Sequence, residues 1–332
     1  MADHNGQTEH PFIQHQGIGD AFSGVYFVEQ LFVKLTVKQS EYTDMTLRDK
    51  SGSRNVKHWA RLDGIEKGDW VFISALVGDY QGAPSIVAKN VEKETSPPDL
   101  ENYVPVYPDA EALTSKFDAL KEEMVRLAGE VKDETCVALV EQVYGNSRFF
   151  SNFLECPGSD RPHYGCVGGL LANTVRVTDA AFQMSEQYGL TDEENVILLA
   201  AGLIHRVGVT DAYEFEDCMP RRTKAGKLLG VNNLTLTRVS EALKRVVTAS
   251  QKENGPTINQ EMFMRVLHAM ASYDEVAVKS MTKEAMVLST AHRGDGVMVD
   301  AMDFIDTDLN NGDEFTAFDP LSGRNYYTGI SA

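Results

Sequence analysis

A proline-rich segment, ETSPPDLENYVPVYP at residues 94–108, divides this chain into two parts with different hydrophobic periods. It holds four of the eleven prolines. Because proline fixes φ and lacks an amide donor, neither a central strand nor a helix interior runs through such a segment. We therefore predict two domains joined by a linker at residues 96–109. The length of 332 residues agrees with this number of domains.

Residues 22–95 are predicted to form β-strands. Stretches rich in Val, Phe and Tyr, led by Val25–Val37 and Trp70–Val77, are separated by short turns that contain glycine. Five short strands in a segment of this length fit the OB architecture, a partly open Greek-key barrel. The preceding residues 1–21 carry three acidic side chains, no Lys or Arg and few apolar residues, which predicts a flexible acidic arm.

Residues 110–332 have the hydrophobic period of a helical domain. Leu113, Phe117, Leu120, Met124 and Leu127 recur at intervals of three and four, as on one face of an amphipathic helix. Further helices are predicted near residues 133–144, 167–188, 192–206, 234–250, 258–272 and 275–292. The predicted fold class is α+β with two domains, an N-terminal five-stranded OB-type barrel followed by a mainly α-helical domain.

The formal net charge of −18 is unevenly distributed along the chain. Evenly spread, it would argue against nucleic acid, because phosphates are neutralised by Lys and Arg. The barrel segment 22–95, however, holds ten basic and ten acidic side chains, and residues 219–245 have a net charge of +6. Acid is densest at 294–323, which has eight acidic residues and no base. We therefore expect any single-stranded nucleic acid to be confined to the barrel face and the Arg221–Lys227 loop.

Several classes of protein are excluded by composition. No run approaches 18 consecutive apolar residues, and the first residues, MADHNGQTEHPF, lack the basic and apolar regions of a signal peptide. The four cysteines, at 136, 156, 166 and 218, form no C-x-x-C pair, so no zinc or redox motif is predicted. Reduced, buried thiols fit a cytoplasmic protein. We expect no membrane partner and a cytoplasmic location, in the host cytoplasm if the protein is viral.

The barrel segment interleaves aromatic and basic side chains, as a surface that binds single strands requires. OB barrels stack bases on aromatic rings and follow phosphates with cations. The candidates for nucleic-acid binding are Lys34, Lys38, Tyr42, Lys57, Trp59, Arg61 and Tyr80. We expect Phe27, Trp70 and Phe72 to fill the barrel instead. Since Tyr42, Trp59 and Tyr80 lie in or beside turns, stacking and structural roles are equally open for them.

The sequence PRRTKAGK at residues 220–227 is a second candidate contact with phosphate. Its basic residues are Arg221, Arg222, Lys224 and Lys227, within a domain that is otherwise acidic. An ordinary solvated loop is the alternative, and so is docking on an acidic segment such as 294–323 of another subunit. Opposite potentials on one protomer favour head-to-tail association, so we expect a homo-oligomer.

Several short sequences resemble the YhaM-like 3′→5′ exoribonucleases, in which an OB domain precedes an HD domain. The barrel contributes DMTLRDKSG at 44–52 and NVKHW at 55–59. The matching pieces of the helical region are HYGCVGGLL at 163–171, AAGLIH at 200–205, KLLG at 227–230, VDAMD at 299–303 and GRNYY at 323–327. The resemblance covers most of residues 22–330 in the right order and implies an HD-like helical domain.

The resemblance also assigns positions to metal ligands, and most of these are replaced. HD phosphohydrolases hold divalent metals with His and Asp side chains, and a metal-bound water is the nucleophile. Asn173 stands at the first His position, Arg206 replaces the Asp of the His-Asp pair, and Val231 replaces a later His. Arginine stays cationic, so Arg206 would repel a metal. We therefore expect no metal, no other cofactor and no catalysis. The residues expected to remain as a vestigial hydrogen-bonded cluster around this arginine are His205, His292 and Asp300.

The predicted function is that of a non-catalytic single-stranded-DNA-binding protein. RNA remains open, since recognition of the 2′-OH depends on geometry. Domain order, acidity and the lost metal site also resemble the Drc-like single-stranded-DNA-binding RNA polymerase cofactors of lytic podophages. That resemblance implies cooperative coating of single-stranded DNA in viral transcription or replication, with an RNA polymerase as partner. The alternatives are a metal-dependent 3′→5′ exonuclease and an adaptor whose acidic surface binds a host nucleic-acid enzyme.

Overall fold

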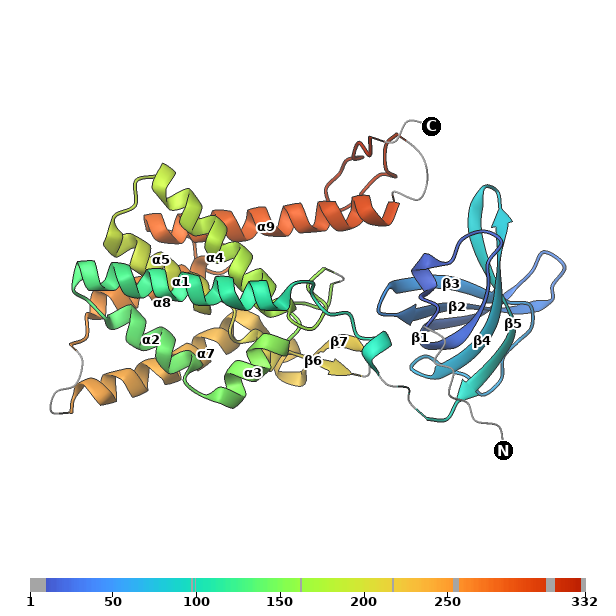
Figure 1. Cartoon of the computed structure of the whole chain (residues 1–332), viewed down its shortest axis with the longest axis horizontal. Helices are drawn as coiled ribbons and strands as arrows, with labels where there is room; N and C mark the ends of the chain where they lie inside the picture. Colours follow the sequence, from blue (N-terminus) through green and yellow to red (C-terminus); the bar gives the residue numbers. More distant parts are fainter. Residues whose placement is uncertain are drawn as a thin grey trace. The chain divides into compact units, whose positions relative to one another are not determined.

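The computed structural model describes residues 10–96, 98, 100–161, 163–216, 218–252, 257–308 and 314–329. The chain divides into two compact units, Met1–Pro105 and Val106–Ala332. The first is a β-barrel and the second is mainly helical (Figure 1). The predicted α+β fold class is therefore confirmed.

Five strands form the barrel: β1 (Ala21–Leu35), β2 (Glu41–Asp49), β3 (Gly52–His58), β4 (Trp70–Tyr80) and β5 (Ala83–Glu94). Their order around the closed barrel is β1-β2-β3-β5-β4, with β1 paired to β4. All pairs are antiparallel except β3 with β5. A closed five-stranded barrel of this kind is the OB architecture that the sequence predicts.

Aromatic residues lie on both sides of the barrel wall. Because side chains alternate along a strand, Val71 and Ile73 of β4 point into the core, whereas Trp70 and Phe72 take the outward positions. Trp70 is nevertheless buried, because Phe27 and Tyr103 pack against it with ring centroids 5.2 and 4.7 Å away. Phe72 is half-buried. Phe27 and Trp70 are therefore buried as expected of packing residues, but the register directs Trp70 and Phe72 outward, so these aromatics do not fill the barrel interior.

Residues 10–20 complete the barrel from outside its strands. The short 3-10 helix η1 (Ile13–His15) places the fully buried Ile13 in the barrel core. The Asp49 carboxylate accepts a hydrogen bond from the Ile13 amide at 2.7 Å, and the Tyr26 hydroxyl donates to the Pro11 carbonyl at 2.5 Å. Residues 1–9 of the predicted flexible arm lie outside the described residues. The described part of the arm is held to the barrel.

The helical unit is built around one buried helix, α5 (Asp192–Ile204), whose residues Val196–Ile204 are all buried. Thr191 and Glu194 form a capping box at its start. The other helices are α1 (Ala110–Val131), α2 (Thr135–Tyr144), α3 (Ser147–Glu155), α4 (Gly169–Gln187), α6 (Val209–Ala212), α7 (Lys224–Ser250), α8 (Gln260–Ser272) and α9 (Lys283–Asp308). Helices α1, α2, α4, α8 and α9 pack against α5.

Among the described residues, one helical stretch, Asp192–Ala212, is long and apolar enough to cross a membrane. Most of its apolar window, 78%, is buried inside the helical unit, which is where a core helix lies. The four cysteines are buried and form no disulfide, as expected.

Two segments of this unit differ from their predicted structure. The predicted loop 220–227 is instead part of a hairpin, β6 (Tyr213–Glu216) with β7 (Met219–Arg222), followed by the first turn of α7. Helix α9 continues to Asp308 rather than ending near 292, so the first half of the acidic segment 294–323 is helical. Packing accounts for the longer helix, since Val299 is buried against Tyr164 and Ala172.

Candidate nucleic-acid interface

The outward surface of β1, β2 and β3 brings several predicted residues together. In the strand register, Lys34 lies opposite Tyr42, and Asp44 lies opposite both Phe32 and Lys57. OB folds bind oligonucleotides on the face of strands 2 and 3 and on the loops that join strands 1 to 2 and 4 to 5. The predicted residues therefore occupy the position in the barrel where OB domains hold their ligands.

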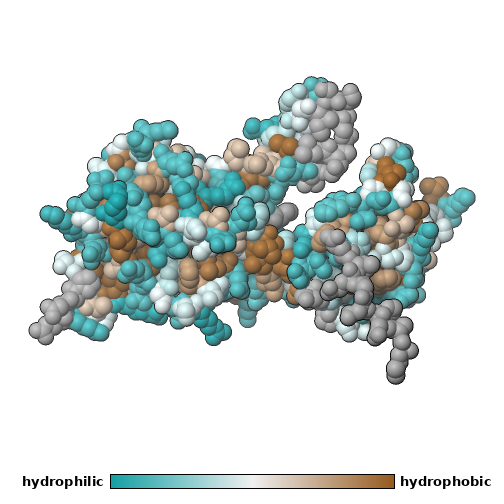
Figure 2. Space-filling model, viewed as in Figure 1, coloured by the Kyte–Doolittle hydropathy of each residue, from teal (hydrophilic) through white to brown (hydrophobic). Residues whose placement is uncertain are grey.

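The two loops contribute the remaining candidates. Lys38 lies between β1 and β2, and Tyr80 ends β4 beside the turn to β5. Two exposed apolar side chains lie near Lys38 in sequence, Leu35 at the end of β1 and Val37 in the loop that follows it. Hydrophobic patches (brown) interrupt the hydrophilic surface of the barrel unit in Figure 2. Apolar side chains that remain exposed together mark interaction surfaces.

Aromatic rings on this face are available for stacking. The exposed fractions of Trp59, Tyr80 and Phe32 are 60%, 61% and 55%. The Trp59 ring packs against the half-buried Tyr42, with centroids 5.4 Å apart and planes inclined by 42°. Phe32 was missed as a candidate in the sequence. Its position two residues before Lys34, hence on the same side of β1, is the signal that could have found it.

Lys34 is neutralised by a carboxylate on the same face. Its ammonium donates a hydrogen bond to Asp44, which also accepts from Asn55 at 2.5 Å. Burial alone would raise the pKa of Asp44, but the hydrogen bonds from Lys34 and Asn55 outweigh it and hold that pKa below its usual value. The hydrogen bond to Asp44 raises the pKa of Lys34. Lys34 therefore reaches a phosphate only if it leaves Asp44.

The other cations of the face differ in how free they are. The Lys57 ammonium lies 5.4 Å from the centre of the Tyr80 ring, a cation–π contact. Neither Lys57 nor Lys38 forms an ion pair with another described residue. Arg61, by contrast, lies beside two carboxylates, those of Glu41 at 3.6 Å and Asp63 at 3.0 Å. Lys38 and Lys57 are thus the cations most available to phosphate.

The predicted basic loop of the helical unit is partly neutralised by its own surroundings. Arg221 lies 3.8 Å from Glu216 across the β6–β7 hairpin, and Arg222 lies 3.2 Å from Asp160. The remaining bases, in the first turn of α7 and without an ion pair in the described part of the chain, are Lys224 and Lys227. Half of the predicted basic contact is therefore engaged within the unit.

The positions that the exoribonuclease resemblance assigns to metal ligands lie together in the helical unit. Arg206 donates to the Asn173 side-chain oxygen at 2.7 Å and to the Gly158 carbonyl at 2.9 Å. Asn173 donates in turn to Asp295 at 3.0 Å. Across the described residues, no three His, Cys, Asp or Glu side chains are grouped to hold a metal ion. A central guanidinium held by neutral acceptors does not fit a divalent cation.

Two histidines, the buried His205 and the half-buried His292, adjoin this guanidinium. The ring centroids of His205 and His292 lie 5.1 and 4.5 Å from that of Tyr273. Burial lowers the pKa of His205 to about 3 and that of His292 to about 2, and the charge of Arg206 adds to both shifts. Both imidazoles are therefore neutral in the folded unit at physiological pH.

The vestigial cluster contains a different carboxylate from the predicted one. Asp300 pairs with Arg161 at 2.9 Å, on the surface, and does not contact Arg206. Asp295 takes its place and accepts from Asn173 and from Arg176, at 3.1 Å. The two aspartates are five residues apart on α9, and at 3.6 residues per turn they face different directions. Asp295 was missed because the last predicted helix ended near residue 292, before this aspartate.

No protein-family model matches this sequence, and no curated protein matches it. Neither HD domains nor YhaM-like exoribonucleases therefore appear as a family match. Among solved structures, 12 chains match. One is the solution NMR structure of the second OB-fold domain of replication protein A from Methanococcus maripaludis. It shares 15% sequence identity and a TM-score of 0.23 with this chain, and the alignment covers 27% of this chain and 100% of the other.

Proposed function

We propose that this protein binds single-stranded nucleic acid on the β2–β3 face of its barrel. The observation that carries the proposal is the set of exposed aromatic rings, Trp59, Tyr80 and Phe32, in a barrel whose Lys38 and Lys57 form no ion pair with another described residue. Every base has a π face, so rings of this kind hold a strand with little sequence preference. Cations that contact phosphates make such binding sensitive to salt.

The ligand in this proposal is single-stranded DNA, and the role is coating of DNA in viral transcription or replication within the host cytoplasm. The distribution of charge supports it, because the barrel is neutral while the excess acid of the helical unit keeps single-stranded nucleic acid off most of that unit. A homo-oligomer and an RNA polymerase are the proposed protein partners. Equal affinity for RNA of the same sequence would widen the ligand to single strands in general.

The test is Trp59→Ala, measured by fluorescence anisotropy with labelled oligo(dT) and oligo(U) at increasing salt. Loss of one stacking ring costs about 1–3 kcal/mol, roughly a 5- to 150-fold loss of affinity. Folding stability should change by less than about 0.5 kcal/mol because the ring is largely exposed. Tyr188→Ala is the matched control, since Tyr188 is 65% exposed and lies in the helical unit.

Wild-type protein that fails to bind either oligonucleotide at low salt would rule out the proposal. If Trp59→Ala and Tyr188→Ala bind the oligonucleotides with equal affinity, the nucleic acid does not bind on this face of the barrel. Capture of a host nucleic-acid enzyme by protein that binds no strand would support the acidic adaptor instead.

We also propose that the helical unit is not catalytic. Arg206, at the position of a bridging Asp in the exoribonucleases that the sequence resembles, donates to neutral acceptors, and the described residues around it hold no ligand set for a metal. Labelled RNA and DNA should stay intact with Mn²⁺. Laddering that EDTA abolishes would replace this proposal with the metal-dependent 3′→5′ exonuclease.

A further inference from the structure

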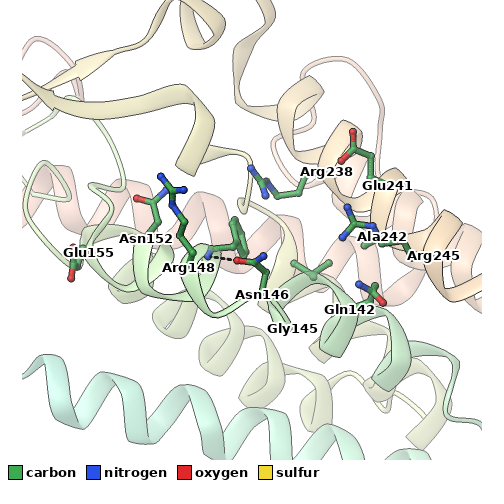
Figure 3. Close-up of a pocket in the computed structure, with 12 residues that line it drawn as sticks. Gln142, Gly145, Asn146, Arg148, Asn152, Glu155, Arg238, Glu241, Ala242 and Arg245 are labelled. Atoms are coloured by element: carbon green, nitrogen blue, oxygen red, sulfur yellow. Dashed lines mark hydrogen bonds between the residues drawn. The ribbon is translucent and has the colours of Figure 1, made fainter.

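A polar hollow of about 850 Å³ lies in the helical unit, lined by the end of α2, by α3 and by α7 (Figure 3). The α7 residues that line it are 238, 241, 242 and 245, whose spacing of three and four puts them on one helix face. In Figure 3 the guanidinium groups of Arg148, Arg238 and Arg245 lie around the hollow, from α3 on one side and α7 on the other.

Arg238 is fixed in place and forms part of the wall. It donates to both oxygens of the Asp211 carboxylate at 2.7 Å, so its charge is balanced. Its guanidinium also lies 4.3 Å from the centre of the Phe149 ring. A planar guanidinium held by a carboxylate and an aromatic ring is restrained, and guanidinium and aromatic groups are surfaces on which a base can stack.

Arg148 and Arg245 have no carboxylate partner in the described part of the helical unit, which is unusual there. Eight of its twelve arginines form ion pairs, as expected in a segment with a large excess of acid. Among the described residues, Arg148 and Arg245 make neither an ion pair nor a side-chain hydrogen bond. The other arginines without a carboxylate partner are Arg206 and Arg324. Two of the four unpaired guanidinium groups thus line one hollow.

Neutral donors and two carboxylates complete the lining. The side chains of Gln142 and Asn152 form no hydrogen bond within the described part of the chain, and Asn146 uses its oxygen to cap α3 through the Phe149 amide at 2.9 Å. Glu155 and Glu241 also line the hollow but pair with none of the arginines. Their charge opposes a polyanion such as a triphosphate, whereas a singly charged phosphodiester needs only two bidentate contacts.

We propose that this hollow binds a nucleotide phosphate through Arg148 and Arg245, with its base against the Arg238–Phe149 wall. The volume is in the range of small-ligand sites and larger than inorganic phosphate requires. The nucleotide belongs either to a single strand or to a free mononucleotide, because both present a base beside a phosphate that carries no more than two negative charges. Only the strand source rests on the function proposed above.

The test compares full-length Arg148→Ala/Arg245→Ala with Arg126→Ala/Arg293→Ala. The control variant loses the same charge from two exposed arginines outside the hollow. With oligo(dT), the Arg148→Ala/Arg245→Ala protein, called the hollow variant below, should lose about tenfold to a hundredfold in affinity. Its slope of log affinity against log salt should become shallower by about 0.7, the value for one phosphate contact to a single strand. The Arg148→Lys/Arg245→Lys variant should recover the salt slope but not the full affinity, because lysine cannot bind a phosphate bidentately.

Free nucleotide is tested with dTMP, by its effect on the melting temperature of each variant. If dTMP stabilises the wild type and the control but not the hollow variant, and the hollow variant binds oligo(dT) as the wild type does, the ligand is a free nucleotide. A hollow variant that matches the control with both probes overturns the inference. The Trp59→Ala variant tests binding of nucleic acid to the barrel alone, and the Arg148→Ala/Arg245→Ala variant tests binding to the hollow. Failure of the proposed function and failure of this inference are therefore distinguishable.

Discussion

Lowering the pH from 8 to 5 should destabilise the helical unit. His205 and His292 stay neutral in the folded unit, since burial lowers their pKa values to about 3 and about 2. In the unfolded chain an imidazole has a pKa near 6.5. Between these values the unfolded state binds more protons than the folded state. The stability that the neutral rings contribute is therefore complete above about pH 6.5 and is lost as the pH falls toward the folded values.

The size of the loss follows from the width of that window. A pH of 5 is roughly 1.5 units below the pKa of an unfolded imidazole, which is therefore mostly protonated. Both folded rings are still neutral at this pH. One unit corresponds to about 1.4 kcal/mol, so each histidine contributes about 2 kcal/mol of destabilisation and the pair about 4 kcal/mol. The figure at pH 5 requires only that both folded pKa values lie well below 5. Carboxylates with lowered pKa, such as Glu194, act mainly below this pH.

The chain lets the two units be followed separately during urea unfolding. Both tryptophans, Trp59 and Trp70, lie in the barrel, whereas circular dichroism at 222 nm reports mainly on the helical unit. The urea concentration at the dichroism midpoint should be lower at pH 5 than at pH 8. The midpoint of the tryptophan fluorescence transition should change much less. His292→Phe removes one titrating ring but keeps an aromatic against Tyr273, so it should halve the effect of pH. A dichroism midpoint that is the same at pH 8 and pH 5 would refute the reasoning.

Three further substitutions test packing and charge. Gly208→Ala should lower the free energy of unfolding by about 1–3 kcal/mol, because its Cβ would lie 2.1 Å from the Thr235 amide nitrogen. Gly296→Ala in α9, whose Cβ would meet nothing within 4 Å, should instead raise it by about 0.5–1 kcal/mol; urea midpoints that shift in the same direction would contradict this contrast. Asp44→Asn should release Lys34 to the strand, raising oligo(dT) affinity and steepening the salt slope by about 0.7, whereas an unchanged slope would mean that Lys34 contacts no phosphate.

The strands and most helices could be predicted because each carries a local signal. Alternating apolar residues and glycine turns mark the five strands of the barrel, and Thr191 with Glu194 marks the start of α5 to the residue. Hairpin β6–β7 has no such signal, because its strands hold only four residues each and one contains Pro220. The second half of α9 contains Gly294 and Gly296, which local propensity disfavours, and tertiary packing overrides that preference.

The candidate site was predicted in composition but not in detail, because pairing depends on residues far apart in sequence. Lys34 is neutralised by Asp44 only because of the β1–β2 register, and Arg161 pairs with Asp300, 139 residues away. A run of basic residues is visible in the sequence, but the sequence does not show which of them pair with a carboxylate in the fold. For this reason the sequence indicated residues 220–227, whereas unpaired arginines line the hollow between α3 and α7.

The anchoring of η1 changes where the barrel can be cut. A fragment trimmed to begin at β1 would leave a void where Ile13 fills the core, and the buried Asp49 carboxylate would keep its hydrogen bonds from Ser51 but lose the one from the Ile13 amide. The Tyr26 hydroxyl would also lose its acceptor. A protease that cleaves between Gln16 and Ala21 should therefore loosen the whole barrel rather than remove a dispensable tail. The shortest excised barrel that keeps its core intact begins well before its first strand.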